Sequence, residues 1–121
     1  MAKILVVDDE RDLRNLVAMV LSGQGHEVES AIDGREGLDK IGSFQPDLVV
    51  LDLMMPEVDG WGVLAALREK QAAAPRVILL SAYANDAATQ RRGVEAGAWA
   101  CLGKPFRLPE LLGTCTRALA P

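Results

Sequence analysis

The chain has 121 residues, half of them hydrophobic but only 4% aromatic, and it carries a formal net charge of −4. This length suits one domain over residues 1–121, whose core must be built from aliphatic side chains. Direct nucleic-acid binding is excluded, because lysine and arginine form no basic block. A membrane-spanning protein is excluded as well, because no apolar run approaches the roughly 20 residues that span a membrane.

From the amino end, the apolar run Ile4–Val7 has the composition of a strand buried on both faces. A helical stripe follows, which Gly23 and Gly25 would end. Its apolar residues are spaced at i, i+3, i+4, i+7 and i+8: Leu13, Leu16, Val17, Val20 and Leu21. His26–Ala31 is a weaker strand candidate, and residues 38–41 mark a short helix after it.

The second half of the chain repeats this alternation. Leu48–Leu51 and Val77–Leu80 are strong strand candidates, and Trp99–Leu102 is a weaker one. Three helical patterns accompany them: Trp61, Leu64 and Leu67; Asp86–Ala96; and Leu108, Leu111, Leu112, Cys115 and Leu119. We expect the Asp86–Ala96 helix to be the least firmly held, because Val94 is its only large aliphatic side chain. Alternating strands and helices predict an α/β fold, with a parallel sheet covered on both faces.

Polar side chains stand at the ends of four predicted strands. They are Asp8, Asp9 and Glu10 after the first run, Asp52 after the third, Ser81 after the fourth and Lys104 just beyond the fifth. Because the carboxyl ends of parallel strands line one edge of an open sheet, we expect these groups to meet there. Carboxylates crowded together repel and raise at least one pKa unless a cation lies among them. Oxygen-only ligands suit Mg²⁺, or Mn²⁺.

An amine and a hydroxyl opposite such a metal would cradle a phosphoryl group. Lys104 would neutralise its charge and Ser81 would donate a hydrogen bond. Asp52, alone at the end of the central run, is the natural nucleophile and would form an acyl phosphate. The pattern therefore indicates phosphoryl transfer onto Asp52.

Each of these residues also has a simpler interpretation. The acidic run 8–10 could cap a helix and complement its dipole. Asp52 could be a turn residue, Ser81 a helix N-cap, and Lys104-Pro105 an ordinary extended dipeptide. Taken singly these alternatives stay open. The joint occurrence of the polar residues at four strand ends favours the phosphoryl site.

Four motifs occur in a specific order and spacing over essentially the whole chain. They are Val6-Val7-Asp8-Asp9-Glu10; Asp52-Leu53-Met54-Met55-Pro56 with Asp59-Gly60; Leu80-Ser81-Ala82; and Gly97-Ala98 with Leu102-Gly103-Lys104-Pro105-Phe106. In these motifs the chain resembles the receiver domains of two-component response regulators. The resemblance implies a flavodoxin-like three-layer sandwich with five helices and a five-stranded parallel sheet in the order 2-1-3-4-5.

The same resemblance implies roles for individual residues. Asp9, Asp52 and the backbone carbonyl of Met54 would ligate Mg²⁺, with Asp8 acting through water. Asp52 would receive its phosphoryl group from a histidine kinase or a histidine phosphotransfer protein. Ser81 and Lys104 would contact phosphoryl oxygens, and the Lys104–Pro105 peptide bond would be cis.

The chain departs from the family at Cys101, where the family places a switching aromatic three positions before the lysine. Tyr83 and Trp99 could take part in the switch instead. Tyr83 and Met54 also stand two positions beyond Ser81 and Asp52, where bulky side chains could shield an acyl phosphate from water. An exposed Trp99 on the face of the fourth helix, fifth strand and fifth helix could anchor a homodimer or an effector.

Three functions compete on this sequence. The leading one is a phosphorylation-driven switch that acts on itself and is not an enzyme for an external substrate. The second function is that of a pseudo-receiver, which binds partners without phosphorylation; the departure from the family at Cys101 leaves this alternative open. A flavin or nucleotide enzyme is disfavoured, because acids replace the phosphate-binding glycines after the first strand. Cys101 and Cys115 lack metal-ligand spacing, so we expect free thiols in the reducing cytoplasm.

Overall fold

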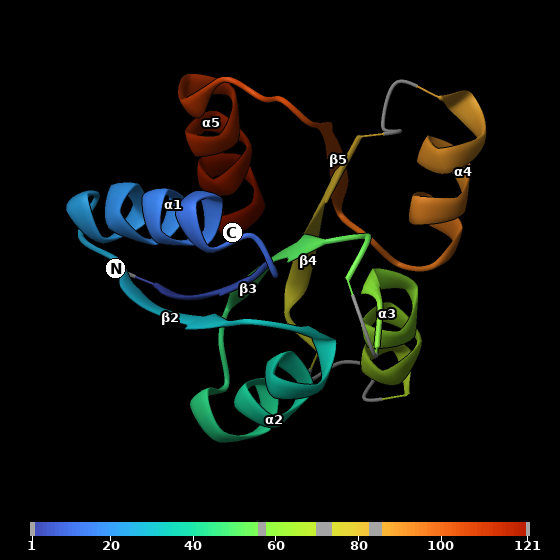
Figure 1. Ribbon diagram of the computed structural model, residues 1–121, viewed down its shortest axis with the longest axis horizontal. Helices are drawn as coiled ribbons and strands as arrows, with labels where there is room; N and C mark the ends of the chain where they lie inside the picture. Colours follow the sequence, from blue (N-terminus) through green and yellow to red (C-terminus); the bar gives the residue numbers. More distant parts are fainter. Residues whose placement is uncertain (1, 56–57, 70–73, 83–85, 121) are drawn as a thin grey trace.

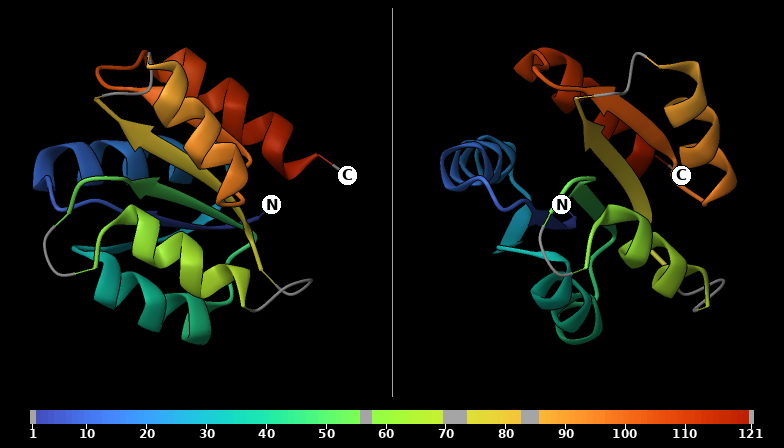
Figure 2. Two further views of the ribbon diagram at one scale, coloured as in Figure 1. Left: turned by 90° about the vertical axis from the view of Figure 1, so that its right-hand side faces the viewer. Right: turned by 45° about the vertical axis from the view of Figure 1, so that its right-hand side comes forward.

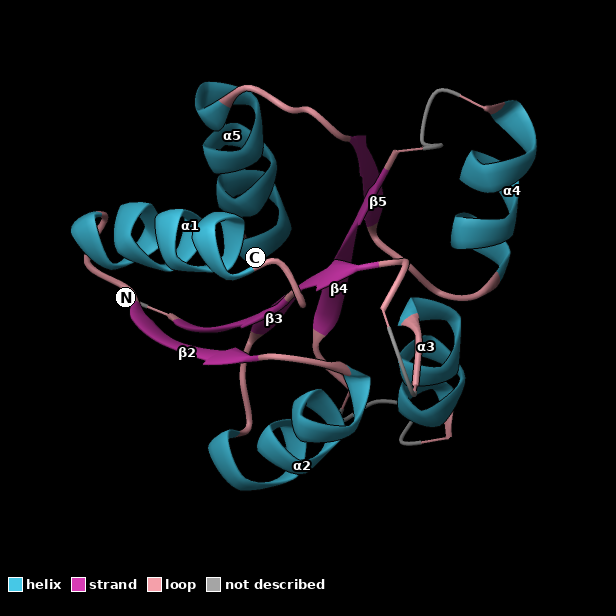
Figure 3. Ribbon diagram, in the orientation of Figure 1, coloured by secondary structure: helices cyan, strands magenta, loops and turns pink. Residues whose placement is uncertain are grey.

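In the computed structural model, which describes residues 2–55, 58–69, 74–82 and 86–120, strands and helices alternate along the whole chain (Figure 1; Figure 3). The strands are β1 Lys3–Val7, β2 Glu27–Ala31, β3 Leu48–Asp52, β4 Arg76–Ser81 and β5 Ala100–Gly103. The helices are α1 Arg11–Gly23, α2 Gly34–Phe44, α3 Gly60–Arg68, α4 Ala87–Glu95 and α5 Leu108–Leu119. The predicted elements are confirmed, with shifted ends: Asp52 and Ser81 complete their strands, and Trp99 precedes β5. The expectation of a short helix at residues 38–41 is wrong, because α2 has 11 residues, more than the 9 of α3 or of α4. No helix of the described residues is both long and apolar enough to cross a membrane.

All neighbouring strands pair in parallel, in the predicted order β2-β1-β3-β4-β5. The register sets the carboxyl ends of the central strands level with one another. Val7 pairs with Leu51, so the next residues along β1 and β3 stand abreast. Ser81 pairs with Gly103 in the same way, one residue before the predicted lysine. The polar residues that follow the strands therefore meet along one edge of the sheet.

Alternate side chains of β1, β3 and β4 enter two separate cores, because successive residues of a strand point to opposite faces. On one face, Leu5, Val7, Val49, Leu51, Val77 and Leu79 pack with buried residues of α2 and α3. On the other, Ile4, Val6, Leu48, Val50, Ile78 and Leu80 pack with α1 and α5. Figure 1 and the turned views of Figure 2 show these helix pairs on opposite sides of the sheet. The three-layer sandwich is thus confirmed.

The predicted stripe of α1 is narrower than its spacing suggested. Val17 and Leu21 are buried, whereas Leu16 is 38% exposed. Neighbouring residues of a helix are separated by about 100°, so Leu16 lies at the margin of the face that Val17 presents to the sheet. Leu16 therefore belongs to the apolar stripe by its spacing but not to the buried core.

Helix α4 has the sparse packing that its composition predicted. Gly93 is its buried residue, and a Cβ there would lie 3.4 Å from Leu79 Cδ1 on β4, while Val94 is exposed to solvent. Polar groups join it to its neighbours: the Arg92 guanidinium lies 4.0 Å from the centre of the Trp61 ring on α3. The side chain of Gln90 donates a hydrogen bond to the backbone oxygen of Cys101 on β5 at 3.3 Å. That α4 is the least stable helix stays a prediction.

Candidate functional site

Three carboxylates meet at the carboxyl edge of the sheet. Asp8 and Asp9 directly follow β1, and Asp52 is the last residue of β3. One carboxylate oxygen from each residue lies within 4.8 Å of the others. Asp8 is 1% exposed and Asp52 is 5% exposed, whereas Asp9 is open to solvent. The structure therefore brings together the acids that the sequence placed at two strand ends.

Backbone and side-chain atoms both hold Asp8 in place. Its N–H donates to the carbonyl oxygen of Ala31 at 3.1 Å, and its Oδ1 accepts from the backbone N–H of Glu10 at 2.9 Å. Glu10 is the N-cap residue of α1, yet its side chain makes no capping hydrogen bond. The helix-capping interpretation is therefore wrong for Glu10, and Asp8 braces the turn before the helix.

Lys104 places an ammonium group between two of the acids. Its Nζ lies 3.2 Å from Asp8 Oδ2 and 3.2 Å from Asp52 Oδ1. The Lys104–Pro105 peptide bond is cis, as the family resemblance implied. The backbone N–H of Lys104 donates to the Ser81 oxygen at 2.9 Å, which joins the end of β5 to the end of β4. Three predicted site residues thus share one ion-pair network.

The pKa values of Asp52 and Lys104 are both shifted within this network. The pKa of Asp52 is raised from 3.8 to about 6, chiefly by burial and then by the Asp8 charge, although Lys104 opposes both. Burial alone would lower the pKa of Lys104, but attraction to Asp52 and Asp8 outweighs it and the pKa is raised. Three carboxylates and one ammonium leave an excess of two negative charges, at a cluster of oxygen donors. That donor set and charge fit a divalent cation such as Mg²⁺ or Mn²⁺.

Ser81, the last residue of β4, and Met54, in the loop after β3, flank the acids. Ser81 ends β4 and is buried, so it is no N-cap; Asp86 is the N-cap residue of α4. Met54 stands two residues beyond Asp52 with an exposed side chain, and the metal-ligand role of its carbonyl stays a prediction. Tyr83 lies outside the described residues.

Gly60 lies in close contact with the backbone of Asp52, the nucleophile candidate, and of Leu53. The N–H of Gly60, at the start of α3, donates to the Leu53 carbonyl at 2.9 Å. A Cβ at this position would lie 2.8 Å from Leu53 Cα and 2.9 Å from the Asp52 oxygen, both backbone atoms that have little freedom to shift. The close approach explains the Asp59-Gly60 motif, which the sequence alone left unexplained.

Gly60→Ala is therefore expected to lower the free energy of unfolding by about 1–3 kcal/mol through overpacking. Gly42→Ala is the matched control: Gly42 lies within α2, and a Cβ there meets nothing within 4 Å. That change is expected to raise stability by about 0.5–1 kcal/mol, because alanine favours the helix. Urea unfolding followed by circular dichroism measures both, and equal effects of the two substitutions would contradict the close-contact argument.

The predicted switch residues lie along β5 and just before it. Cys101 is half-buried against the core that faces α2 and α3. Trp99 is 39% exposed, with the Arg76 guanidinium 6.0 Å from its ring centre. Both cysteines are free, and burial raises the pKa of each thiol, that of Cys115 to about 11. The free thiols are confirmed, whereas a switching role for Trp99 or Cys101 stays a prediction.

Arg14 belongs to this edge of the sheet, and the sequence interpretation missed it. Its Nη1 donates to the backbone oxygen of Asp8 at 2.9 Å. The available signal was an arginine in the second turn of a helix that begins directly after an acidic run. Such a position can reach back to the turn, but helix periodicity alone also permits it to face solvent.

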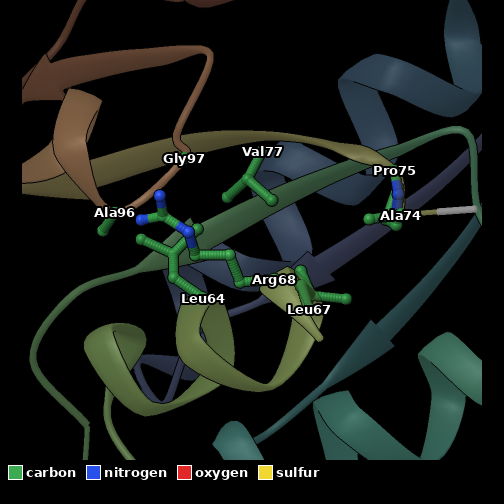
Figure 4. Close-up of a pocket in the computed structure, with 8 residues that line it drawn as sticks. All are labelled: Leu64, Leu67, Arg68, Ala74, Pro75, Val77, Ala96 and Gly97. Carbon is green, nitrogen blue, oxygen red and sulfur yellow. The ribbon is translucent and has the colours of Figure 1, made fainter. Parts of the chain in front are cut away.

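Among the hollows of the described residues, one lies beside the acids and another at the opposite edge of the sheet. A groove of about 380 Å³ opens beside Lys104, lined by Glu10, Leu13, Leu16, Lys104, Pro105, Phe106 and Leu108. The pocket in Figure 4, of about 190 Å³, lies between α3, the start of β4 and the turn after α4. There the Arg68 side chain extends toward Ala96 and Gly97 and donates to the Glu95 oxygen. Because this pocket lies at the amino end of β4, it is separate from the acids.

Comparison with curated proteins gives a consistent result. The family model of the response regulator receiver domain matches residues 4–116. The response regulator MprA of Mycolicibacterium vanbaalenii is 48% identical over 111 residues, which are 91% of this chain and 47% of that protein. MprA of Mycobacterium avium is 46% identical over the same shares. The chain thus spans about half the length of the curated relatives it matches.

Solved structures give the same result for the fold. The Vibrio cholerae chemotaxis protein CheY4 has a TM-score of 0.90 and 35% identity, with 98% of this chain and 99% of that chain covered. The Francisella response regulator 1452 receiver domain has a TM-score of 0.91 and 32% identity, over 98% and 97% of the two chains. The similarity therefore extends over the whole sandwich and is not confined to its acidic edge.

Proposed function

The chain belongs to the response regulator receiver domain family of two-component systems, and from this we propose that it accepts a phosphoryl group on Asp52 and changes its partner-binding surface in response. One observation carries the proposal. The buried Asp52 carboxylate lies 3.2 Å from the Lys104 ammonium and shares its oxygen cluster with Asp8 and Asp9. This arrangement places a nucleophile, a cationic side chain and a set of metal ligands next to one another.

The chain's own residues supply most of the chemistry. A carboxylate oxygen of Asp52 attacks phosphorus, the bond from phosphorus to the donor nitrogen breaks, and its electron pair leaves with a partner imidazole. At neutral pH Asp52 is mainly ionised, because its pKa is raised only to about 6. The Lys104 ammonium and the Ser81 hydroxyl then face the phosphoryl oxygens.

Asp8, Asp9 and Asp52, with the backbone carbonyl of Met54, are the residues that would hold Mg²⁺, or Mn²⁺. When bound, the cation supplies positive charge that offsets the charge developing on the phosphoryl oxygens. The proposed donors are a histidine kinase or a histidine phosphotransfer protein. Support for such a donor comes from the groove beside Lys104, whose leucine, proline and phenylalanine side chains offer apolar contact next to the acceptor.

The proposed output surface comprises α4, β5 and α5. Exposed Trp99 and Val94 could anchor a homodimer or an effector there, since tryptophan is enriched among interface hot spots. Sparse burial of α4 supports a shift between two arrangements of this face, in which phosphorylation favours one. We place this receiver domain, residues 1–121, in the cytoplasm, without direct nucleic-acid contact by the domain or turnover of an external substrate.

Intact mass spectrometry tests the proposed function. Wild-type protein incubated with Mg²⁺ and acetyl phosphate or phosphoramidate is expected to gain about 80 Da, the mass of one HPO₃ unit, in a form that decays in water. EDTA is expected to prevent the gain, because the cluster then keeps its uncompensated charge. The absence of any gain with either donor, in protein that binds Mg²⁺, would favour the pseudo-receiver that Cys101 keeps open.

A further inference from the structure

We propose that Arg14 is a positioning residue for the metal site, which holds the turn between β1 and α1 so that Asp9 stays within reach of Mg²⁺. This inference rests on the proposed function. Arg14 touches neither the nucleophile nor a phosphoryl oxygen, so it would act through the acidic turn. Its contact is with backbone, at the peptide unit that joins Asp8 to Asp9.

The geometry of that peptide unit carries the inference. The Nη1 of Arg14 donates to the backbone oxygen of Asp8 at 2.9 Å, and the backbone N–H of Arg14 donates to the backbone oxygen of Glu10, the N-cap residue of α1, at 2.9 Å. A peptide unit is planar, so holding its oxygen also sets the direction in which the chain leaves toward Asp9 Cα. Arg14 thus ties the orientation of Asp9 to the first turns of α1.

Asp9 depends on this backbone support more than its neighbours do. Asp8 is held through both carboxylate oxygens, by the Glu10 N–H at 2.9 Å and by Lys104 at 3.2 Å. The exposed Asp9 makes no side-chain hydrogen bond or salt bridge with another described residue, although its charge raises the pKa of Asp52. Repulsion from the other two carboxylates favours rotation of Asp9 toward solvent. A fixed peptide plane opposes that rotation and keeps the three ligands gathered.

If Arg14 acted only through its positive charge, its removal would have a smaller effect on Mg²⁺ binding than loss of the hydrogen bond would. Arg11 provides a control for the effect of charge. Arg11 lies in the first turn of the same helix, is exposed, and makes no hydrogen bond or salt bridge among the described residues. Arg11→Ala and Arg14→Ala remove the same charge near the same acids. Only Arg14→Ala removes the hydrogen bond to the turn.

Isothermal titration calorimetry of Mg²⁺ binding to the full chain tests the proposal, because it does not depend on phosphorylation. Arg14→Ala is expected to raise the Mg²⁺ dissociation constant about tenfold, the lower end of the effect of removing a group that orients metal ligands. Arg11→Ala is expected to leave it within about twofold. Arg14→Lys, which keeps a donor and the charge, is expected to recover most of the affinity.

Phosphoryl uptake measured across Mg²⁺ concentrations separates positioning from general damage to the fold. Arg14→Ala is expected to shift the Mg²⁺ concentration for half-maximal uptake by the same factor and to leave the maximal rate within about twofold. Should Arg14→Ala fail to fold, Arg14→Gln keeps an amide donor without the charge and is expected to bind Mg²⁺ more tightly than a non-donor, Arg14→Met.

Two results would overturn the proposal. Equal Mg²⁺ affinities of the Arg14→Ala and Arg11→Ala proteins, with wild type that binds Mg²⁺ and accepts phosphate, would refute the positioning role alone. Equal affinities of the Arg14→Gln and Arg14→Met proteins would refute it in the same way. Wild type that neither binds Mg²⁺ nor gains phosphate would refute the proposed function, and the positioning role with it.

Discussion

Asp52→Asn is expected to abolish phosphoryl uptake. In the absence of metal, the variant is also expected to have a higher free energy of unfolding at pH 7 than wild type. Asparagine keeps the shape of the side chain but presents no ionised oxygen to attack phosphorus. It also removes a charge that burial and Asp8 disfavour. The pKa of Asp52 rises from 3.8 to about 6, and a difference of about 2 in pKa corresponds to about 3 kcal/mol. We expect a gain of about 1–3 kcal/mol, because the attraction between Lys104 and Asp52 is lost as well.

The pH dependence of this gain has a defined sign. Because the folded state raises the pKa of Asp52 above its unfolded value of 3.8, the folded protein binds more protons than the unfolded chain up to about pH 6. The stability contributed by Asp52 is therefore fully present below about pH 4 and is lost as pH rises through about 6. The variant and wild type should be equally stable near pH 3.5, and the advantage of the variant should reach its full value by about pH 7.

Urea unfolding in EDTA at several pH values measures this difference. Asp39→Asn is the matched control, because Asp39 is exposed on α2 and makes no hydrogen bond or salt bridge among the described residues. Millimolar Mg²⁺ is expected to narrow or reverse the advantage, since bound metal stabilises the folded wild type. If Asp52→Asn is less stable than wild type at pH 7 in EDTA, the ionised Asp52 carboxylate does not destabilise the fold, and the argument from its raised pKa is contradicted.

Lys104→Met is expected to lower the stability of the metal-free protein by roughly 3 kcal/mol at pH 7. The substitution leaves Asp8 and Asp52 in a buried site without the ammonium that lies 3.2 Å from both. Removing one partner of a buried ion pair typically destabilises by about 3–5 kcal/mol. The lower end applies here, because the Lys104 side chain is 19% exposed and Asp52 can take up a proton.

A double-mutant cycle checks this assignment. Asp52→Asn in the Lys104→Met background is expected to restore most of the lost stability, because one uncompensated charge disappears. Lys40→Met serves as the control, since the half-buried Lys40 pairs with the exposed Glu29 at 4.0 Å and donates to the Ser30 carbonyl at 2.6 Å, but pairs with no buried acid. That pair is worth about 1 kcal/mol or less. Additive effects of the two site substitutions would argue against a shared network of Lys104 and Asp52.

Much of the fold was predictable because its signals are local. Buried strands such as Leu48–Asp52 are continuous apolar runs, and a parallel sheet follows from strictly alternating elements, whereas the strand order came from the family resemblance. The acids and Lys104 were also predictable as a group, because strand ends share one edge of a sheet. The exposure of Leu16 could not be predicted, since spacing identifies an apolar stripe but not the angle at which a helix rests on its sheet.

The sequence by itself determined the sandwich and the residue types at its acidic edge, because hydrophobic period and strand-end position depend on neighbours along the chain. The tertiary structure decided the rest. The raised pKa of Asp52 requires its burial beside Asp8, and the need for glycine at position 60 follows from the approach of α3 to β3. The bond from Arg14 to Asp8 likewise depends on how α1 leaves its turn. These properties arise from distances between segments that only folding brings together.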